Sequence, residues 1–398
     1  MANLTGSLVR WSALAVTCAA GFAACSGAEQ HRNAYDGGGA GGETANGGAS
    51  AAATTPNGGH AAAAASDPGA AGINHAGGAP NNGAVGDGGA LGEGDGGAPI
   101  AAKLCDAVVF TDPHLEMIMR GATGVSTGPI PPARAAAIAL AFASSLLVSN
   151  LDGMECFTGL TRFEAASCTI SDLTPLAGLK NLTYLALSNN KITDISPLAR
   201  LTNLQTLLLK SNQVPDISAL AEMKKLTAVG LASNKLLTDI SVLADKTALQ
   251  VVEIDQDSNI TSVQPLANLK ALTKLTMREV ALPDTALLAD KVKLTYLDAS
   301  LTGITNIDFL TNLTAMQTLV LSNNQFSDIS VLATLDKLNH VDLDSTLVTD
   351  ISPLAANPGI QKGDTVFVQQ MSFADCTAHL AAAQALVDRG VTLLAQCP

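Results

Sequence analysis

A leucine pattern recurs nine times between residues 160 and 359, and it limits the possible folds more than any other feature. Each unit follows LxxLxL, with other apolar residues at some positions, and successive units start 22 or 23 residues apart. One such unit cannot bury its apolar face alone, so neighbouring units must stack. We therefore expect a solenoid. The units start at Leu160, Leu182, Leu204, Leu226, Leu249, Leu272, Leu294, Met316 and Leu338.

The first half of each unit predicts a short strand followed by an inward turn. The two leucines of LxL lie on one face, because successive side chains of a strand point to opposite faces. The ninth residue is polar in most units, and we expect its side chain to satisfy backbone groups at the turn. A free cysteine can fill this position without being reactive. The nine residues are Cys168, Asn190, Asn212, Asn234, Asp257, Val280, Thr302, Asn324 and Thr346.

The second half of several units carries DISPL or a close variant, which predicts a short helix of 3₁₀ type. We expect Ser196 and Ser352 to be N-caps, with Pro197 and Pro353 at the first helical position. The aspartates of this motif recur at one place in many units, which favours a structural role over metal binding. They are Asp194, Asp216, Asp239, Asp328 and Asp350.

Two lysines interrupt the apolar pattern. Lys246 and Lys291 occupy the position that holds Leu201, Leu269 and Leu313 in other units. A lysine stem can pack against apolar neighbours while its amine reaches water. We therefore expect these lysines to be local weak points of the stack, with amines in contact with solvent.

This repeat resembles the leucine-rich repeat, and specifically the 22-residue repeat of internalin-like secreted bacterial proteins. The resemblance covers about half of the chain, residues 160–359, as nine units. It implies an α/β solenoid, a right-handed superhelix of horseshoe shape with a parallel sheet on its concave side. Short 3₁₀ or helical segments would form the convex side, and caps would cover both ends.

Residues 104–159 resemble the N-terminal cap of secreted repeat proteins. The stretch FTDPHLEMIMR, residues 110–120, predicts the opening helix of this cap, with Asp112 as its N-cap. Cys105 and Cys156 flank the cap and would form a disulfide bond. The apolar run 135–148 is short for a membrane span, and we expect a buried element of the cap there.

Residues 360–398 are expected to form the C-terminal cap. A closing strand and turn would be followed by one helix, a stop at Gly390, a further strand and a final cysteine. Cys376 and Cys397 would form a second disulfide bond, closing a short loop.

The chain begins with features of bacterial export. Residues 1–24 read as a secretory signal, in which Arg10 is the only charge and an apolar run follows. The sequence FAACS resembles a lipobox, which implies that Cys25 becomes a lipid anchor. Residues 25–103 are rich in glycine and alanine and predict a disordered tether. The expected location is the outer membrane or cell surface, with ordinary secretion as the alternative.

Charge and motifs exclude several functions. A net charge of −13 disfavours nucleic acid and anionic membrane surfaces as partners, because both require a basic face. The membrane would be contacted only through the lipid. The chain contains no HExxH, CxxC, GxSxG or Walker motif. We therefore expect no enzyme activity, no catalytic residues, no metal and no cofactor.

The residues that the leucine pattern leaves free are the candidates for binding, because they project from the concave sheet. Any one of them can also be an ordinary solvated strand residue, but tyrosine and arginine are enriched at binding hot spots. The predicted partner-binding residues are Tyr184, Lys210, Glu253, Asp255, Lys274, Arg278, Tyr296, Asp298, His340 and Asp342.

The sequence thus predicts non-catalytic protein–protein recognition or adhesion at the cell surface by a monomeric protein. The partner would be another protein. The alternatives are a structural component of the cell envelope and, third, a polysaccharide-binding protein. Polysaccharide binding requires stacked aromatic rings, and the concave face offers only Tyr184 and Tyr296.

Overall fold

The computed structural model describes residues 105–144, 147–369 and 376–395. The predicted signal peptide, the Cys25 lipid anchor and the tether lie outside these residues, as does Cys397; the side chain of Cys376 is also not described. No helix among the described residues is long and apolar enough to cross a membrane.

The described residues contain one parallel sheet of twelve strands, in which spatial order follows sequence order. Strands β2 to β10 come from the nine units, and β1, β11 and β12 extend the sheet at its two ends. The strands are β1 (Leu140–Phe142), β2 (Arg162–Glu164), β3 (Tyr184–Ala186), β4 (Thr206–Leu208), β5 (Ala228–Gly230), β6 (Val251–Glu253), β7 (Lys274–Thr276), β8 (Tyr296–Asp298), β9 (Thr318–Val320), β10 (His340–Asp342), β11 (Thr365–Val368) and β12 (Thr392–Ala395). The predicted parallel sheet is confirmed.

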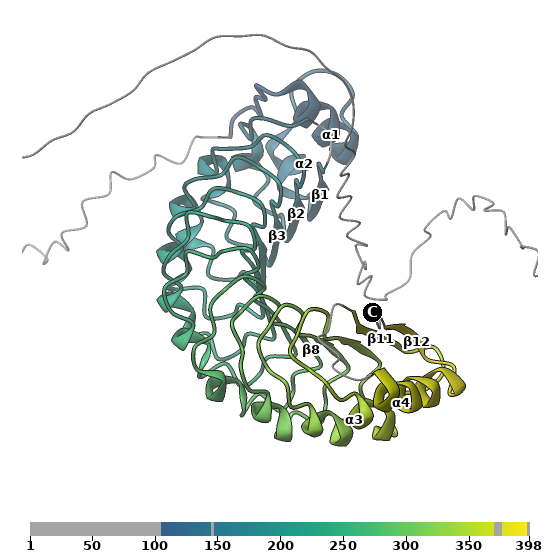
Figure 1. Ribbon diagram of the computed structural model, residues 1–398. Helices are drawn as coiled ribbons and strands as arrows, with labels where there is room; N and C mark the ends of the chain where they lie inside the picture. Colours follow the sequence, from purple (N-terminus) through teal and green to yellow (C-terminus); the bar gives the residue numbers. More distant parts are fainter. Residues whose placement is uncertain (1–104, 145–146, 370–375, 396–398) are drawn as a thin grey trace, which may run out of the picture. The chain divides into compact units, whose positions relative to one another are not determined.

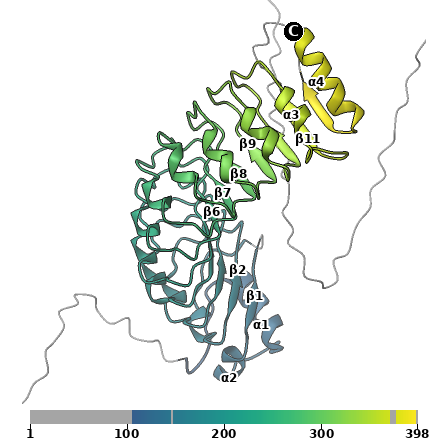
Figure 2. The ribbon, with the colours of Figure 1, turned by 90° about the horizontal axis from the view of Figure 1, so that it is seen from below.

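Short helical segments return the chain from each strand to the next. In Figure 1 they follow the outer side of the stack while the strands follow its inner side, and Figure 2 shows the same stack from below. The 3₁₀ segments are η1 (Met154–Cys156), η2 (Thr174–Leu176), η3 (Ser196–Arg200), η4 (Ser218–Leu220), η5 (Ser241–Leu243), η6 (Gln264–Leu266), η7 (Thr285–Leu288), η8 (Asp308–Asn312) and η9 (Ser330–Thr334). The α-helices are α1 (Pro113–Thr123), α2 (Pro132–Ala136), α3 (Ser352–Ala356) and α4 (Cys376–Asp388).

The core lies between the sheet and these helical segments. It consists of the repeated apolar positions: Leu185, Leu187, Ile192 and Leu198 of the second unit are inaccessible to solvent, and their counterparts in other units are buried as well. Each unit therefore buries its apolar residues against the units before and after it, which gives the stack one continuous core.

The ninth residue of the unit satisfies backbone groups of two successive turns, as predicted. The Nδ2 of Asn190 donates to the carbonyl oxygens of Ala165, at 2.8 Å, and Leu187, at 2.9 Å. Its Oδ1 accepts the backbone N–H of Ile170 at 3.0 Å. The same arrangement recurs at Asn212, Asn234 and Asn324.

Cys168 fills the corresponding position in the first unit. Its buried thiol donates to the carbonyl oxygen of Ala143 at 3.3 Å. We call the row of ninth residues, one from each unit, the ladder. Each ladder residue follows one residue with a left-handed backbone, whose φ lies between 54° and 64°. These residues are Ser167, Asn189, Ser211, Ser233, Gln256, Glu279, Leu301, Asn323 and Ser345. One left-handed residue per unit turns the chain inward after the strand, which presents the ladder side chain to the interior.

The prediction that serine caps the helix in DISPL is wrong, because Ile195 occupies the N-cap position and the preceding aspartate supplies the side-chain acceptor. Helix η3 starts at Ser196, so Ser196 lies inside the helix. The carboxylate of Asp194 accepts the backbone N–H of Ser196 at 2.8 Å and its hydroxyl at 2.9 Å. Asp350 and Ser352 repeat the arrangement at α3. Asp194 and Asp350 are structural, as expected, because each accepts the backbone N–H of the first residue of its helical segment.

The prediction that the amines of Lys246 and Lys291 reach water is also wrong. Both side chains are completely buried. The Lys246 Nζ donates to the carbonyl oxygen of Ala221 at 3.0 Å and to Asp245 Oδ1 at 2.5 Å. Lys291 makes the equivalent contacts with the carbonyl of Ala267 and with the neighbouring Asp290. The amines stay inside because an adjacent aspartate and a carbonyl of the preceding unit satisfy them.

The N-terminal end is held by Asp112, the predicted N-cap of α1. Its Oδ1 accepts the backbone N–H groups of His114, at 2.9 Å, and Leu115, at 3.1 Å. Its Oδ2 accepts the N–H of Ser149 at 2.7 Å and the hydroxyl at 2.9 Å. Burial alone would raise the pKa of Asp112, but the hydrogen bonds, chiefly those from Ser149 and Leu115, lower it to about 2. A disulfide bond joins Cys105 to Cys156.

Among the described residues of the apolar run 135–148, only Ala135, Ala141, Ala143 and Val148 are buried, which corrects the expectation of a buried element. The run contains β1, at the N-terminal end of the strand order. Ala141 and Ala143 are buried, whereas Leu140 and Phe142 are each 51% exposed. Side chains that alternate along a strand at the end of a sheet put one apolar face in the core and leave the other outside.

The C-terminal end continues the sheet without a leucine pattern. Strand β11 pairs with β10, and β12 pairs with β11. Helix α4 lies between these two strands in sequence, and Gly390 follows it with a φ of 83°, a conformation that glycine adopts without steric cost.

Candidate functional site

The concave side of the sheet carries three columns of outward side chains. The first and third residues of each strand form two columns, because the second residue is buried in all nine unit strands. The residue two places after each strand forms a third. All ten predicted partner-binding residues lie in these columns: Tyr184, Lys274, Tyr296 and His340 in the first, Glu253, Asp298 and Asp342 in the second, and Lys210, Asp255 and Arg278 in the third.

Glu253 is the centre of an ion-pair network that spans β4 to β7. Its two carboxylate oxygens accept from Lys210 Nζ at 2.5 Å and from Lys274 Nζ at 2.7 Å. Burial alone would raise the pKa of Glu253, but the hydrogen bonds and charges of the two lysines lower it below its ordinary value. The structure thus brings three predicted residues together, and the two lysines together more than offset the charge of Glu253.

Strand β5 lies between Lys210 and Glu253, and its glycine leaves room for their contact. The outward residues of this unit are Ala228, Gly230 and Ala232, which look featureless in the sequence. A Cβ on Gly230 would lie 3.2 Å from the Lys210 Cε and 3.3 Å from Glu253 Oε2. Sequence reasoning missed this role of Gly230. The available signal was a strand of small residues with opposite charges on either side.

Tyr184 is covered by a residue outside the predicted set. The guanidinium of Arg162 lies 3.8 Å from the centroid of the Tyr184 ring, within the range of a cation–π interaction. Arg162 also pairs with Glu164 on its own strand, at 2.5 Å. Burial, followed by the charge of Glu164, raises the pKa of the Tyr184 hydroxyl. This tyrosine therefore does not present a bare ring on this side.

The outward side chains of the strands β8, β9 and β10 form what we call the β8–β10 face: Tyr296, Asp298, Thr318, Val320, His340 and Asp342. Asp298 Oδ1 accepts the hydroxyl of Ser300 at 2.7 Å and its backbone N–H at 3.1 Å. Asp342 Oδ1 accepts the backbone N–H of Asp344 at 3.0 Å. In both cases a backbone amide two residues further on fixes the orientation of the carboxylate.

Negative charges accumulate at this face. Burial raises the pKa of Asp342 to about 6, and the charges of Asp344 and Asp298 contribute, against the attraction of Arg278. Burial also raises the pKa of Asp255, and Asp298 adds to the shift. Unlike Glu253, neither Asp298 nor Asp342 makes an ion pair with a lysine or arginine within 4.0 Å among the described residues.

The two rings of the β8–β10 face differ in their surroundings. Lys274 Nζ lies 5.1 Å from the centroid of the Tyr296 ring. The ring of His340 contacts Phe367 edge-on, with centroids 5.4 Å apart, and its Nδ1 lies 2.5 Å from Thr365 Oγ1. Burial lowers the pKa of His340, which favours the neutral form of the ring.

Asp257 lies in the interior, at the ladder position of the fifth unit, and is completely buried. Its Oδ1 accepts the backbone N–H of Asn234 at 2.6 Å, whereas its Oδ2 has no hydrogen-bond partner. Burial, with a smaller contribution from the charge of Asp255, raises its pKa to about 7. Asp257 therefore satisfies fewer backbone groups than the asparagines at the same position of other units, and it does not belong to the concave surface.

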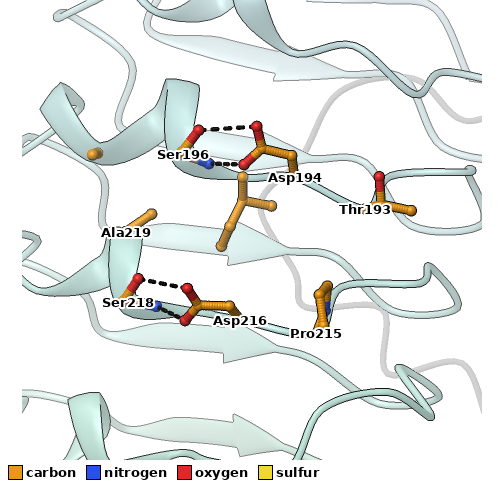
Figure 3. Close-up of a pocket in the computed structure, with 9 residues that line it drawn as sticks. Thr193, Asp194, Ser196, Pro215, Asp216, Ser218 and Ala219 are labelled. Atoms are coloured by element: carbon orange, nitrogen blue, oxygen red, sulfur yellow. Dashed lines mark hydrogen bonds between the residues drawn. The ribbon is translucent and has the colours of Figure 1, made fainter. Parts of the chain in front are cut away.

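A hollow of about 450 Å³ lies on the opposite side, between η3 and η4 (Figure 3). Asp194 and Asp216 line it, and each carboxylate is already bound to the serine two residues further on. No group of three or more His, Cys, Asp or Glu residues in the described part of the chain is arranged to hold a metal ion. The hollow is the groove between two adjacent turns, and its polar groups are used by the scaffold.

Comparison with known proteins agrees with the architecture. Residues 158–200, 292–334 and 314–356 match the family "Leucine Rich repeats (2 copies)". An internalin, InlF from Listeria monocytogenes, is similar in structure with a TM-score of 0.64 and 27% sequence identity, over 72% of this chain and 90% of that protein. The functional domain of InlJ from the same species, which includes a cysteine ladder, gives a TM-score of 0.52 and 23% identity, over 68% of this chain and 67% of that one.

A search of curated proteins found no match. The parallel sheet, the 3₁₀ segments and the matching repeats define the fold as a leucine-rich-repeat solenoid. Within that class the chain is similar in structure to the internalins InlF and InlJ.

Proposed function

We propose that this protein recognises another protein through the concave side of its sheet and has no catalytic role. The observation that carries the proposal is the contrast between the two kinds of position in each unit. The buried positions repeat from unit to unit, whereas the outward columns change from the Glu253 network to the carboxylates of the β8–β10 face. Leucine-rich-repeat folds commonly present such extended concave surfaces to protein partners.

The ten predicted residues remain the proposed contact surface, with Arg278, Tyr296 and Asp298 near its centre. Polysaccharide binding is less well supported, because sugar rings stack on open aromatic faces. A cation already lies 3.8 Å from the Tyr184 ring centroid and 5.1 Å from that of Tyr296. We retain a structural role in the cell envelope as the alternative that the following experiment distinguishes.

Replacing Arg278, Tyr296 and Asp298 together by alanine is expected to weaken partner binding at least about tenfold, since central arginine and tyrosine side chains dominate interfaces. The partner would be identified by crosslinking the full-length protein on intact cells, and the dissociation constant then measured with the purified partner. Arg200→Ala/Glu222→Ala, on the helical side, removes one positive and one negative charge and serves as the control. Equal binding by both variants and the wild type would exclude the concave surface and favour the structural role.

The proposal includes a location at the cell surface, with Cys25 as a lipid anchor and the protein as a monomer. Replacing Cys25 by alanine is expected to move the protein from the membrane fraction to the soluble fraction, because the variant lacks the acyl chains that insert into the bilayer. The intact mass of the native protein should correspond to a lipidated chain starting at residue 25. A Cys25→Ala protein that stays with the membranes would contradict the anchor.

A further inference from the structure

We propose that the β8–β10 face docks an extended segment of a protein partner that carries arginine or lysine side chains. This inference rests on the proposed function, because it assigns a partner chemistry to part of the same concave surface. The strands follow the inner side of the stack (Figure 1), and the β8–β10 face combines two carboxylates with one apolar and two ring side chains.

The sheet fixes the spacing of the two carboxylates. Asp298 of β8 and Asp342 of β10 are both paired with Val320 of β9, so they lie at the same height two strands apart. Neighbouring strands are about 4.8 Å apart, which places the two Cα atoms roughly 10 Å apart. An extended segment in the polyproline II conformation has three residues per turn and advances about 3.1 Å per residue, so two basic residues three positions apart lie on one face and span about the same distance.

Each carboxylate has one oxygen engaged and one oxygen open. The Oδ1 atoms of Asp298 and Asp342 accept the backbone amides of Ser300 and Asp344. Neither Oδ2 accepts a hydrogen bond from a described residue. A guanidinium or ammonium group donates charge-assisted hydrogen bonds to such an oxygen. The methylene stem of the same side chain can cover Val320, which is partly exposed between the two carboxylates.

Charge complementarity favours a cationic occupant over a neutral one. The chain supplies two lysines to Glu253, whereas Asp342 experiences the repulsion of Asp298 and Asp344. A cation between Asp298 and Asp342 relieves this repulsion. Burial lowers the pKa of His340, which disfavours an opposing positive charge on its ring.

The test measures binding of a labelled peptide with arginine at every third position to the full-length protein, by fluorescence anisotropy at several salt concentrations. Asp298→Asn/Asp342→Asn keeps the Oδ1 acceptors and removes two charges, and it should raise the dissociation constant at least about tenfold, or about 1.4 kcal/mol. Glu222→Gln/Asp336→Asn removes two charges from exposed positions outside the concave columns and should change it less than about twofold. The same peptide with glutamate in place of arginine should not bind.

Three results would overturn the inference. Equal weakening by both double variants would show only general attraction to a chain of net charge −13. Unchanged binding by Asp298→Asn/Asp342→Asn would place the peptide elsewhere. A concentration-dependent dimer, detected by sedimentation without peptide and lost in this variant, would make a second copy the occupant. If the peptide test fails while Arg278→Ala/Tyr296→Ala/Asp298→Ala still loses its captured partner, the proposed function stands and only the partner chemistry is wrong.

Discussion

Replacing Asp257 by asparagine is expected to raise the free energy of unfolding at pH 7.5 by about 3–4 kcal/mol. Two effects act in this direction. The variant does not need to bury an ionised carboxyl whose Oδ2 lacks a partner. Its Nδ2 can donate to the carbonyl of Ile254, as Asn212 donates to Leu209 and Asn324 to Leu321. Because the pKa of Asp257 rises from 3.8 to about 7, the linkage corresponds to about 4 kcal/mol at most.

The effect of this substitution depends on pH in a defined direction. Between pH 4 and pH 7 the folded state keeps the proton of Asp257, whereas the unfolded chain releases it. Stability from this group is therefore fully present below about pH 4, falls by about 1.4 kcal/mol per pH unit up to pH 7, and is constant above. The difference between Asp257→Asn and the wild type should accordingly be smallest near pH 4 and largest above pH 7.

Urea unfolding of both proteins at several pH values measures this difference. Asn324→Asp is the matched control, because it introduces a carboxyl into a ladder position that now holds an amide. It should lower stability more at pH 7.5 than at pH 4. A constant difference between Asp257→Asn and the wild type from pH 4 to pH 8 would contradict the raised pKa.

Removing the Cys105–Cys156 disulfide bond is expected to lower stability at the N-terminal end by a comparable amount. The bond closes a loop between residues 51 apart in sequence, and the chain-entropy model assigns about 4 kcal/mol to a loop of this length. In Cys105→Ala/Cys156→Ala, the loss should concentrate in the cap, because each unit of a solenoid contacts only its neighbours.

Hydrogen exchange detects this local loss. The amides of α1 should exchange faster in the variant, while those of β6 to β10 keep their protection. Cys168→Ala, which removes a buried thiol that forms no cross-link, should leave α1 unchanged. Equal protection of α1 with and without the disulfide would mean that Asp112 and the buried residues of the cap hold it without the bond.

The repeated part of the fold could be predicted because its signals are local and recur. Asn190, Asn212 and Asn324 each donate to a backbone carbonyl oxygen 25 residues earlier in the chain. The contacts of one unit therefore predict those of the others. The capping residue was predicted wrongly because aspartate and serine both cap helices, and the pattern alone does not say where the helix begins. Strand β1 lacks a leucine pattern, and its exposed Leu140 and Phe142 could not be distinguished from core residues.

The candidate site was predictable as a set of positions but not as a set of contacts. Alternation along the strand identifies which residues face outward. The Lys210–Glu253 pair depends on a side chain reaching across an intervening strand, which Gly230 and a long lysine stem together favour. The surroundings of Lys246 likewise depend on a carbonyl 25 residues earlier in the chain. Such contacts are set by packing in three dimensions, and periodicity does not encode them.

Because the strands are strictly sequential in space, the length of the sheet is proportional to the number of units. Each inner strand is hydrogen-bonded to the strands before and after it, and insertion or deletion of one unit changes the length of the sheet by one strand spacing, about 4.8 Å. The distance between the Arg162–Tyr184 pair and the β8–β10 face is therefore set by the count of intervening units. Insertion or deletion of whole units would change that distance in equal increments and leave the residues at both sites unchanged. The unit that contains β5 tolerates the least change, because its small residues leave room for Lys210 to reach Glu253.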